Sequence, residues 1–159
     1  MRYGIPALAS TRTAKGRRSR GRLLPSQDDV LYESLEVPAV KWKYGLEEAR
    51  QTGRPPEIEV FAYNTKEDFE RASVGMVEAR GRHGRIRQPI SDRAYLVLEG
   101  EGEFFFGDEE DEVVPVAKDD VVLIPKNTVY DYRGRMRLFL VHTPAYEQDS
   151  DVHLDDLWD

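Results

Sequence analysis

Residues 92–132 read DRAYLVLEGEGEFFFGDEEDEVVPVAKDDVVLIPKNTVYDY, and this stretch decides the fold of the 159-residue chain. Its apolar runs are short, and turns rich in Gly, Asp and Pro separate them about every eight or nine residues. That spacing is typical of a small antiparallel barrel or sandwich. The Gly-rich pieces 99–102 and 134–135 are predicted as two of the tight turns. Strands are predicted at 95–98, 103–106, 113–116, 121–124, 129–132 and 137–142.

More strands are predicted before this stretch. Residues 57–63 alternate charged and apolar side chains, which is the pattern of a strand with one buried face. Residues 72–80 have the composition of another strand. Residues 37–44 are predicted as a first edge strand, because Pro38 cannot donate a hydrogen bond to a neighbouring strand. The chain is therefore predicted to be all-β.

The composition restricts the class of protein. A chain of 159 residues has room for one domain, and 40% hydrophobic with 33% charged residues fits a soluble globular protein. No apolar run approaches the roughly 18 residues that span a bilayer, so no membrane association is expected. The absence of cysteine rules out disulfides, thiolate catalysis and Cys-bound metal centres. We expect a cytoplasmic location.

Charge is distributed unevenly along the chain. Residues 1–22 hold seven basic and no acidic side chains, although the whole chain has a net charge of −7. Such a block is typical of a solvated arm, and residues 1–25 are predicted to be flexible or to embrace a second subunit. Contact with nucleic acid through residues 1–22 and a transit peptide are the alternatives. Residues 26–146 are predicted to form the barrel, and 147–159 an acidic tail that either docks or frays.

Two stretches resemble the motifs of the cupin superfamily. The phrase LEGEG at 98–102 matches the end of the first motif, and DDVVLIPKNTVY at 119–130 follows the second motif without its two glycines. The resemblance covers about residues 75–145. It implies an antiparallel double-stranded β-helix, the cupin or jelly-roll barrel, with an extended N-terminal arm. It also implies a homodimer, often built by exchange of N-terminal strands.

The metal ligands usual in cupins are missing from this sequence. Arg93 takes the position of the glutamate ligand and Tyr130 that of the last histidine ligand. A guanidinium cannot ligate a cation, so we predict that the barrel holds no metal and no other cofactor. A site rebuilt from His83, His142 and a carboxylate is the alternative. The two remaining histidine positions of the family fall on Ile86 and Gln88, or on Arg87 and Pro89.

The same replacements indicate a ligand site of another kind. Arg93 would attract an anion and clamp a carboxylate or phosphate, unless it simply pairs with an acid such as Asp92 or Glu99. Tyr130 donates a hydrogen bond to a ligand, acts as a weak general acid, or packs as a core aromatic. The predicted ligand-binding residues are Arg87, Gln88, Arg93, Tyr95, Tyr130 and Tyr132, and the predicted catalytic residues are Tyr130 and His142.

Three hypotheses about function remain open. The first is a metal-independent cupin that binds a small polar or anionic organic molecule in its lumen. The second is a cofactor-free isomerase, epimerase or cyclase that uses Tyr130, Arg93 and His142. The third is a structural dimerisation module whose lumen is filled by side chains: Ile86, Tyr95, Tyr130 and Met136.

The resemblance to cupins also implies how such an enzyme would work. Metal-free cupin-like epimerases of nucleotide-linked sugars move a proton with a histidine–aspartate pair. His142 or His83, together with Asp92 or Asp131, would imitate that pair.

Overall fold

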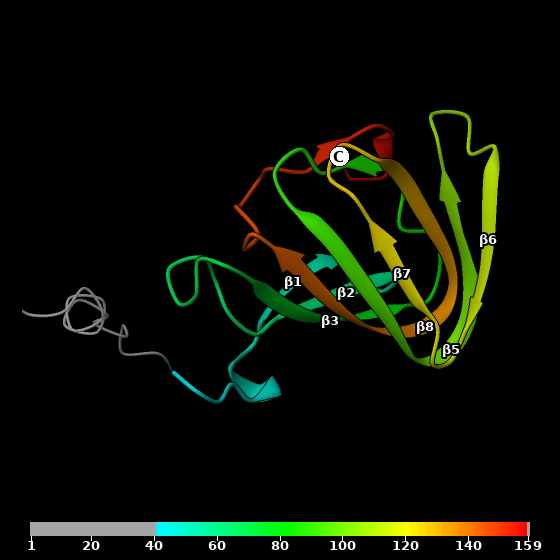
Figure 1. The fold of residues 1–159 in the computed structure, drawn as a ribbon. Helices are drawn as coiled ribbons and strands as arrows, with labels where there is room; N and C mark the ends of the chain where they lie inside the picture. The colour runs from blue at the N-terminus through cyan, green and yellow to red at the C-terminus, as the bar shows by residue number, and fades with distance from the viewer. Residues whose placement is uncertain (1–40, 159) are drawn as a thin grey trace, which may run out of the picture. The chain divides into compact units, whose positions relative to one another are not determined.

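A computed structural model describes residues 41–158 and places them in an all-β, antiparallel fold (Figure 1). The predictions for the basic arm, residues 1–25, lie outside the described residues. So does most of the predicted edge strand at 37–44, whose last residues, 41–44, are not in a strand. The homodimer stays a prediction.

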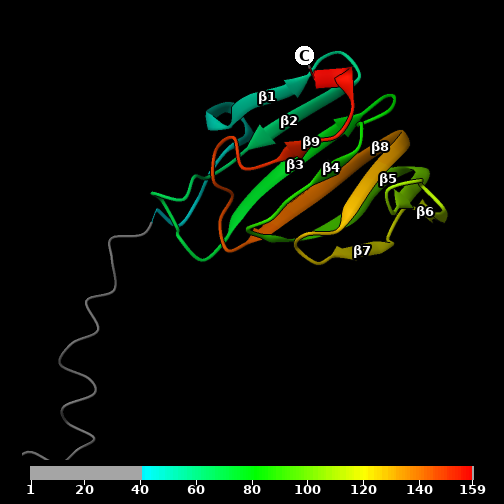
Figure 2. The same cartoon turned by 90° about the horizontal axis from the view of Figure 1, so that it is seen from above.

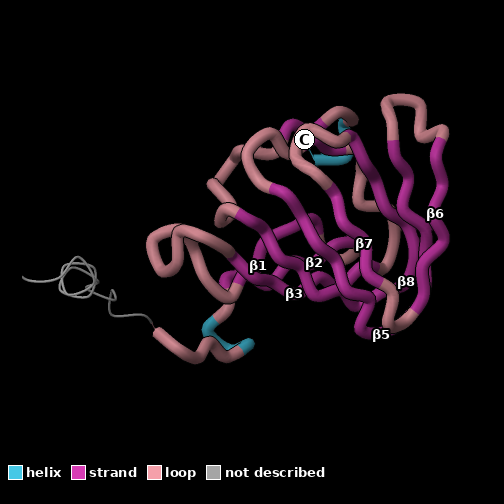
Figure 3. Tube along the Cα trace, in the orientation of Figure 1, coloured by secondary structure: helices cyan, strands magenta, loops and turns pink. Residues whose placement is uncertain are grey.

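Within the described residues, nine strands form one sheet that curls on itself (Figures 1 and 2). Their spatial order is β1-β2-β3-β8-β4-β9, and β5 pairs with β6, β7 and β8. Figure 3 shows that strands and loops make up almost all of this part. None of its helices is long and apolar enough to cross a membrane. The elements are η1 (Leu46–Glu48), β1 (Arg50–Arg54), β2 (Ile58–Ala62), β3 (Ser73–Ala79), β4 (Ile86–Arg87), β5 (Asp92–Phe106), β6 (Glu112–Ala117), β7 (Val121–Ile124), β8 (Val129–Thr143), β9 (Val152–His153) and η2 (Asp156–Trp158).

Two of the predicted turns are wrong, because they lie inside the two longest strands. Residues 99–102 and 134–135 are not turns but bends inside β5 and β8, which pair with each other along most of their length. The register shifts between Val97 and Glu99, and Gly100 and Gly134 have φ angles of 83° and 146°. Glycine adopts such angles without a Cβ penalty, so each strand turns a corner of the barrel and continues its pairing.

Gly100 is required at its corner by sterics as well as by its backbone angle. A Cβ there would lie 1.9 Å from the carbonyl oxygen of Arg135. We expect Gly100→Ala to lower the free energy of unfolding by about 2–4 kcal/mol, measured by urea denaturation. Gly81→Ala is the control, because its Cβ would meet only the flexible side chain of Glu57, at 3.2 Å. Equal losses in the two variants would contradict this account of the corner.

The other strand predictions are mostly confirmed. The stretches at 57–63, 72–80, 113–116 and 121–124 become β2, β3, β6 and β7. β1 was missed, because its sequence RQTGR is polar and mostly exposed and therefore lacks the alternation that marks a strand.

Strand alternation decides which side chains enter the lumen. On β5, Arg93, Tyr95 and Val97 are buried while their neighbours are partly exposed, and Tyr130 and Tyr132 are buried on β8. The four residues proposed to fill the lumen are all buried, so side chains do occupy one part of the barrel. The core consists of Ile58, Val77, Ala79, Ile86, Tyr95, Val97, Phe104, Val116, Val122, Ile124, Tyr130, Tyr132, Met136, Leu138 and Leu140.

The acidic C-terminal segment docks on the barrel as far as the structure describes it. Its strand β9 pairs with β4, with Val152 opposite Arg87 and His153 opposite Ile86. The backbone N–H of Leu154 donates to the carbonyl oxygen of Arg85 at 2.9 Å. This docking brings the acidic residues of the segment to the mouth of the barrel.

Candidate functional site

A cavity of about 450 Å³ opens at the end of the barrel that the C-terminal segment borders. Its size is within the range of small-molecule sites. Strands β1, β2, β3, β5 and β8, the loop before β4 and the C-terminal segment all contribute to its wall. The buried or partly buried polar residues of its wall include Ser73, His83, Arg93, Tyr95, His142 and Asp151. The lumen is thus filled in one part and hollow in another, which does not favour a purely structural module.

A chain of hydrogen bonds links Arg93, Tyr130 and Tyr95. Nη1 of Arg93 donates to the hydroxyl oxygen of Tyr130, and the hydroxyls of Tyr130 and Tyr95 lie 2.8 Å apart. Burial raises the pKa of Tyr95, and it raises that of Tyr130 well above its usual value, against the opposing charge of Arg93. Both phenols therefore carry their protons at neutral pH and can donate them.

Arg93 also pairs with an acid, but not with either of the acids expected from sequence. Its Nη2 donates to Oδ1 of Asp151, from the C-terminal segment. Gln88 holds the same oxygen through its side-chain amide at 3.0 Å. Asp92 instead accepts from the backbone N–H of Lys126. Arg93 is therefore neutralised inside the site by a residue 58 positions away in the sequence.

His83 lies against the tyrosines of β8. Its ring stacks on Tyr132 with centroids 4.4 Å apart and on Tyr130 at 6.2 Å. Nδ1 lies 2.8 Å from the carbonyl oxygen of Gly84 and must carry the proton, because a carbonyl only accepts. Burial lowers the pKa of His83 to about 4, against that hydrogen bond and with help from the charge of Arg93. The ring is therefore neutral at pH 7, with its lone pair on Nε2.

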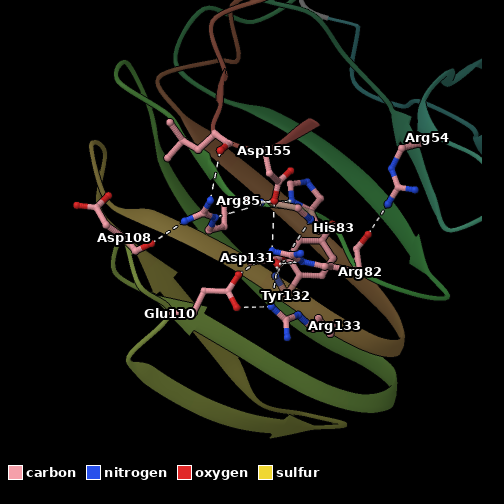
Figure 4. Close-up of polar contacts among 12 residues, drawn as sticks. Arg54, Arg82, His83, Arg85, Asp108, Glu110, Asp131, Tyr132, Arg133 and Asp155 are labelled. Carbon is pink, nitrogen blue, oxygen red and sulfur yellow. Dashed lines mark hydrogen bonds and ion pairs between the residues drawn. The ribbon is translucent and has the colours of Figure 1, made fainter. Parts of the chain in front are cut away.

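A charged network fixes the loop that carries His83 (Figure 4). Asp131 is fully buried and accepts from the backbone N–H of Gly84 at 2.7 Å and from Nε of Arg82 at 2.5 Å. Arg82 also contacts Glu110 at 2.7 Å and Asp155 at 3.2 Å. Figure 4 shows these groups converging on the loop from β8, from the β5–β6 turn and from the C-terminal segment. The residues on either side of His83 are thus held from three directions.

His142 forms a second polar pair in the cavity wall. Its Nδ1 lies 3.3 Å from Oγ of Ser73, which also accepts the backbone N–H of Tyr146 at 2.9 Å. Burial lowers the pKa of His142 well below its usual value, so this ring is also neutral. The two residues face each other across the β3–β8 pairing, in which Ser73 is opposite His142.

The structure brings most of the predicted site residues together, and it separates one of them. Tyr95, Tyr132, Arg93 and His142 line the cavity, while Gln88 and Tyr130 stand behind the wall and bond to residues that line it. Arg87 is exposed, because Ile86, its neighbour on β4, points into the core and alternation turns Arg87 outward. The prediction missed the pairing of Arg93 with Asp151 and the Ser73–His142 contact; none of these partners is close in sequence.

The donor set does not fit a divalent metal. The family's glutamate and last histidine positions hold the Arg93 guanidinium and the Tyr130 phenol, which bond to each other and not to a shared centre. Within residues 41–158, no group of three or more His, Asp or Glu side chains is arranged to hold an ion. His83 and His142 each use Nδ1 for a contact within the protein.

No family model and no curated protein sequence matches this chain. Among solved structures it is similar to Pac13 from Streptomyces. A uridine-bound Pac13 with a histidine-to-glutamine change is 26% identical, with a TM-score of 0.65, and the match covers 73% of this chain and 92% of Pac13. Two more uridine-bound structures, also 26% identical, each carry one tyrosine-to-phenylalanine change. A further Pac13 structure, 27% identical, is described as a unique nucleoside dehydratase.

More distant structures share the fold. The polyketide cyclase RemF from Streptomyces resistomycificus is 12% identical, with a TM-score of 0.58 over 73% of this chain and 87% of RemF. An RmlC-like cupin from Shewanella frigidimarina is 10% identical, with a TM-score of 0.54 over 67% of this chain and 94% of its own. At these identities the likeness concerns the fold alone.

Proposed function

This chain has the fold of the cupin superfamily, and from that premise we propose that it binds an uncharged nucleoside and eliminates water from the sugar without a metal. The observation that carries the proposal is the cluster of His83 and Tyr95, which line the cavity, with Tyr130, which contacts both of them from behind the wall. A nucleoside is a small polar ligand, in line with the lumenal ligand expected from the sequence. The charge of Arg93 alone would favour an anion, but Asp151 already neutralises it.

The spacing of these residues supports the assignment. In the uridine-bound Pac13 structures, the replaced histidine precedes the first replaced tyrosine by thirteen positions, and the second tyrosine follows thirty-four later. In this chain Tyr95 follows His83 by twelve positions, and Tyr130 follows Tyr95 by thirty-five. The same three residue types thus recur in the same order and at nearly the same intervals.

The walls of the cavity suit a nucleoside. Aromatic rings stack on nucleobases, and such stacking contributes about 1–3 kcal/mol per base. The cavity offers several of them: Tyr95, Tyr132, Tyr146, His83 and His142. Polar side chains between the rings, including Ser73 and Asn64, provide partners for sugar hydroxyls and base edges.

In the proposed elimination each group has a role. His83 takes a C–H proton on Nε2, the electrons form the carbon–carbon double bond, and a β-hydroxyl leaves. Tyr95 gives its proton to that hydroxyl, so that water departs, and the proton on His83 afterwards restores the phenol. A base with a pKa of about 4 is weak. The C–H bond must therefore be acidified by a neighbouring aldehyde or ketone, so we expect the substrate to carry a carbonyl on its sugar.

Two measurements test the proposal. Uridine is expected to bind in calorimetry, with uracil and ribose alone at least about tenfold weaker. Nucleosides oxidised to an aldehyde or ketone on the ribose are expected to lose one water, detected by mass spectrometry. Absence of uridine binding, or binding of ribose as tight as that of uridine, would refute the nucleoside site.

Binding without turnover is the second candidate, and the low pKa of His83 is the observation that favours it. Under this alternative the protein stores or carries a nucleoside, and the phenols act only as hydrogen-bond donors. The mass-spectrometric assay separates the candidates, because only the dehydratase releases the unsaturated product.

A further inference from the structure

Arg93 is a cation enclosed in the wall of a ligand cavity. It is the second residue of β5, alternation turns it inward, and only 5% of it is exposed. Its two terminal nitrogens bond to Tyr130 and Asp151, while its Nε–H has no partner among residues 41–158. A guanidinium in this position would bind an incoming anion strongly if nothing else matched its charge.

Asp151 neutralises the charge of Arg93, and its carboxylate is held in place by other contacts. Its Oδ1 accepts from Arg93 and from the Gln88 amide at 3.0 Å. The same amide donates to Oγ of Ser150 at 2.8 Å. Val152, which follows Asp151, begins β9, and β9 pairs with β4. The carboxylate is therefore fixed from both sides, by a side chain of the barrel and by the strand that follows it.

The other charged residues of the cavity cannot replace this pair. They are all exposed at the mouth, where Lys66 contacts Glu147 at 3.1 Å and Arg50 contacts Gln148 at 3.3 Å. Water screens charges in such positions, whereas Arg93 and Asp151 lie in a poorly solvated wall. The exposed charged lining residues are Arg50, Lys66, Glu67, Glu147 and Asp149.

We propose that Asp151 is a specificity-determining residue: by neutralising Arg93 it makes the site select an uncharged nucleoside over a phosphorylated one. A nucleotide phosphate brought to Arg93 meets a carboxylate that already occupies the guanidinium and repels the anion. Removal of the carboxylate converts the site into an anion receptor. The choice of nucleosides as ligands rests on the proposed function, but the effect on anions does not.

The variant Asp151→Asn tests this with inorganic phosphate and with uridine 5′-monophosphate as probes. Asparagine keeps the size of the side chain and one acceptor oxygen while it removes the charge. Calorimetry is expected to show at least about tenfold tighter binding of both anions than in the unaltered protein. Uridine affinity is expected to change far less, so the preference shifts toward the nucleotide.

Asp149→Asn is the matched control. It removes one carboxylate from the same segment, and asparagine tolerates the positive φ of 60° at this position. Asp149 is exposed and lines the mouth of the same cavity. Anion binding is expected to stay within about twofold of the unaltered protein in this variant. Equal gains in the two variants would mean that net charge alone is responsible, and the inference would fall.

A loss of stability in Asp151→Asn leaves the test intact. The buried guanidinium then lacks its partner, so added phosphate should raise the melting temperature of this variant more than that of the unaltered protein. The double variant Arg93→Gln/Asp151→Asn removes both charges and should show neither effect. A double variant that gains phosphate binding, or a single variant that phosphate leaves unchanged, would overturn the inference. If Asp151→Asn gains phosphate binding but uridine does not bind, the inference about Asp151 stands and the proposed nucleoside site is refuted.

Discussion

Replacing His83 with glutamine is expected to slow water elimination from a carbonyl-bearing nucleoside by about 10²- to 10⁴-fold. Glutamine still presents an N–H that can donate to the Gly84 carbonyl, but it has no ring nitrogen with a lone pair to accept a proton. Uridine affinity should stay within about threefold, because the loss concerns the transition state and not the bound ground state. Single-turnover mass spectrometry measures the rate, and calorimetry measures the affinity.

His142→Gln is the comparison that gives this result meaning. His142 was predicted from the sequence as a catalytic residue, but its Nδ1 contacts Ser73 and its ring packs on Tyr146, whereas His83 stacks on Tyr130 and Tyr132. We expect its replacement to cost about tenfold or less, mainly through weaker ligand contacts. A larger loss from His142→Gln than from His83→Gln would reverse the roles assigned to the two rings.

The pH dependence of the rate reports on the same base. A base acts in its neutral form, and the pKa of His83 is lowered to about 4. The rate should therefore be nearly constant from about pH 8 to 5 and fall only near pH 4, whereas an ordinary histidine would lose activity near 6.5. Stability has a related trend: the unfolded chain binds the proton at higher pH, so acidification from about 6.5 toward 4 destabilises the fold. Rates at the acid end should therefore be taken well below the melting temperature.

The strands could be predicted because alternation and turn residues are local signals. The same alternation predicted that Tyr130 and Tyr132 share one face of their strand, and both are buried on β8. Arg93 lies before the strand predicted at 95–98, and in the structure it is buried on β5 like Tyr95. The corners at Gly100 and Gly134 were misassigned as turns, since glycine permits both a reversal and a bend inside a long strand. Sequence alone does not tell whether pairing continues past the glycine.

The partners within the site could not be predicted, because they come from remote parts of the chain. Asp151 lies in the acidic tail that was predicted either to dock or to fray, and no local pattern indicated that β9 would bring it to Arg93. Ser73 is an ordinary polar residue at the start of β3, and only the β3–β8 register places it beside His142. The prediction that Arg93 clamps an anion did not include the neutralising contact with Asp151, because no local sequence pattern indicates that contact.

Tyr95→Phe is expected to lower the elimination rate by about 10²- to 10⁴-fold, with uridine affinity within about threefold of the unaltered protein. Tyr95 lines the cavity, and its hydroxyl lies 2.8 Å from that of Tyr130. Because Arg93 only donates, the Tyr130 oxygen accepts from it, and Tyr130 can pass its own proton toward Tyr95. The Tyr95 hydroxyl is then directed to the leaving group, and phenylalanine removes that proton source together with the acceptor of the Tyr130 hydroxyl. The rate is followed by mass spectrometry in single turnovers.

Tyr130→Phe separates the proton donor from the residue that supports it. Tyr130 stands behind the wall, so its loss should reduce the rate only about tenfold while Tyr95 remains able to donate. It should cost more stability than Tyr95→Phe, since it leaves Nη1 of the buried Arg93 without its acceptor, at about 1–3 kcal/mol in urea denaturation. The two variants thus have opposite orders in the two measurements: Tyr95→Phe is worse for rate, and Tyr130→Phe is worse for stability. The same order in both measurements would mean that the phenols act as one structural unit, and Tyr95 would lose its assignment as the acid.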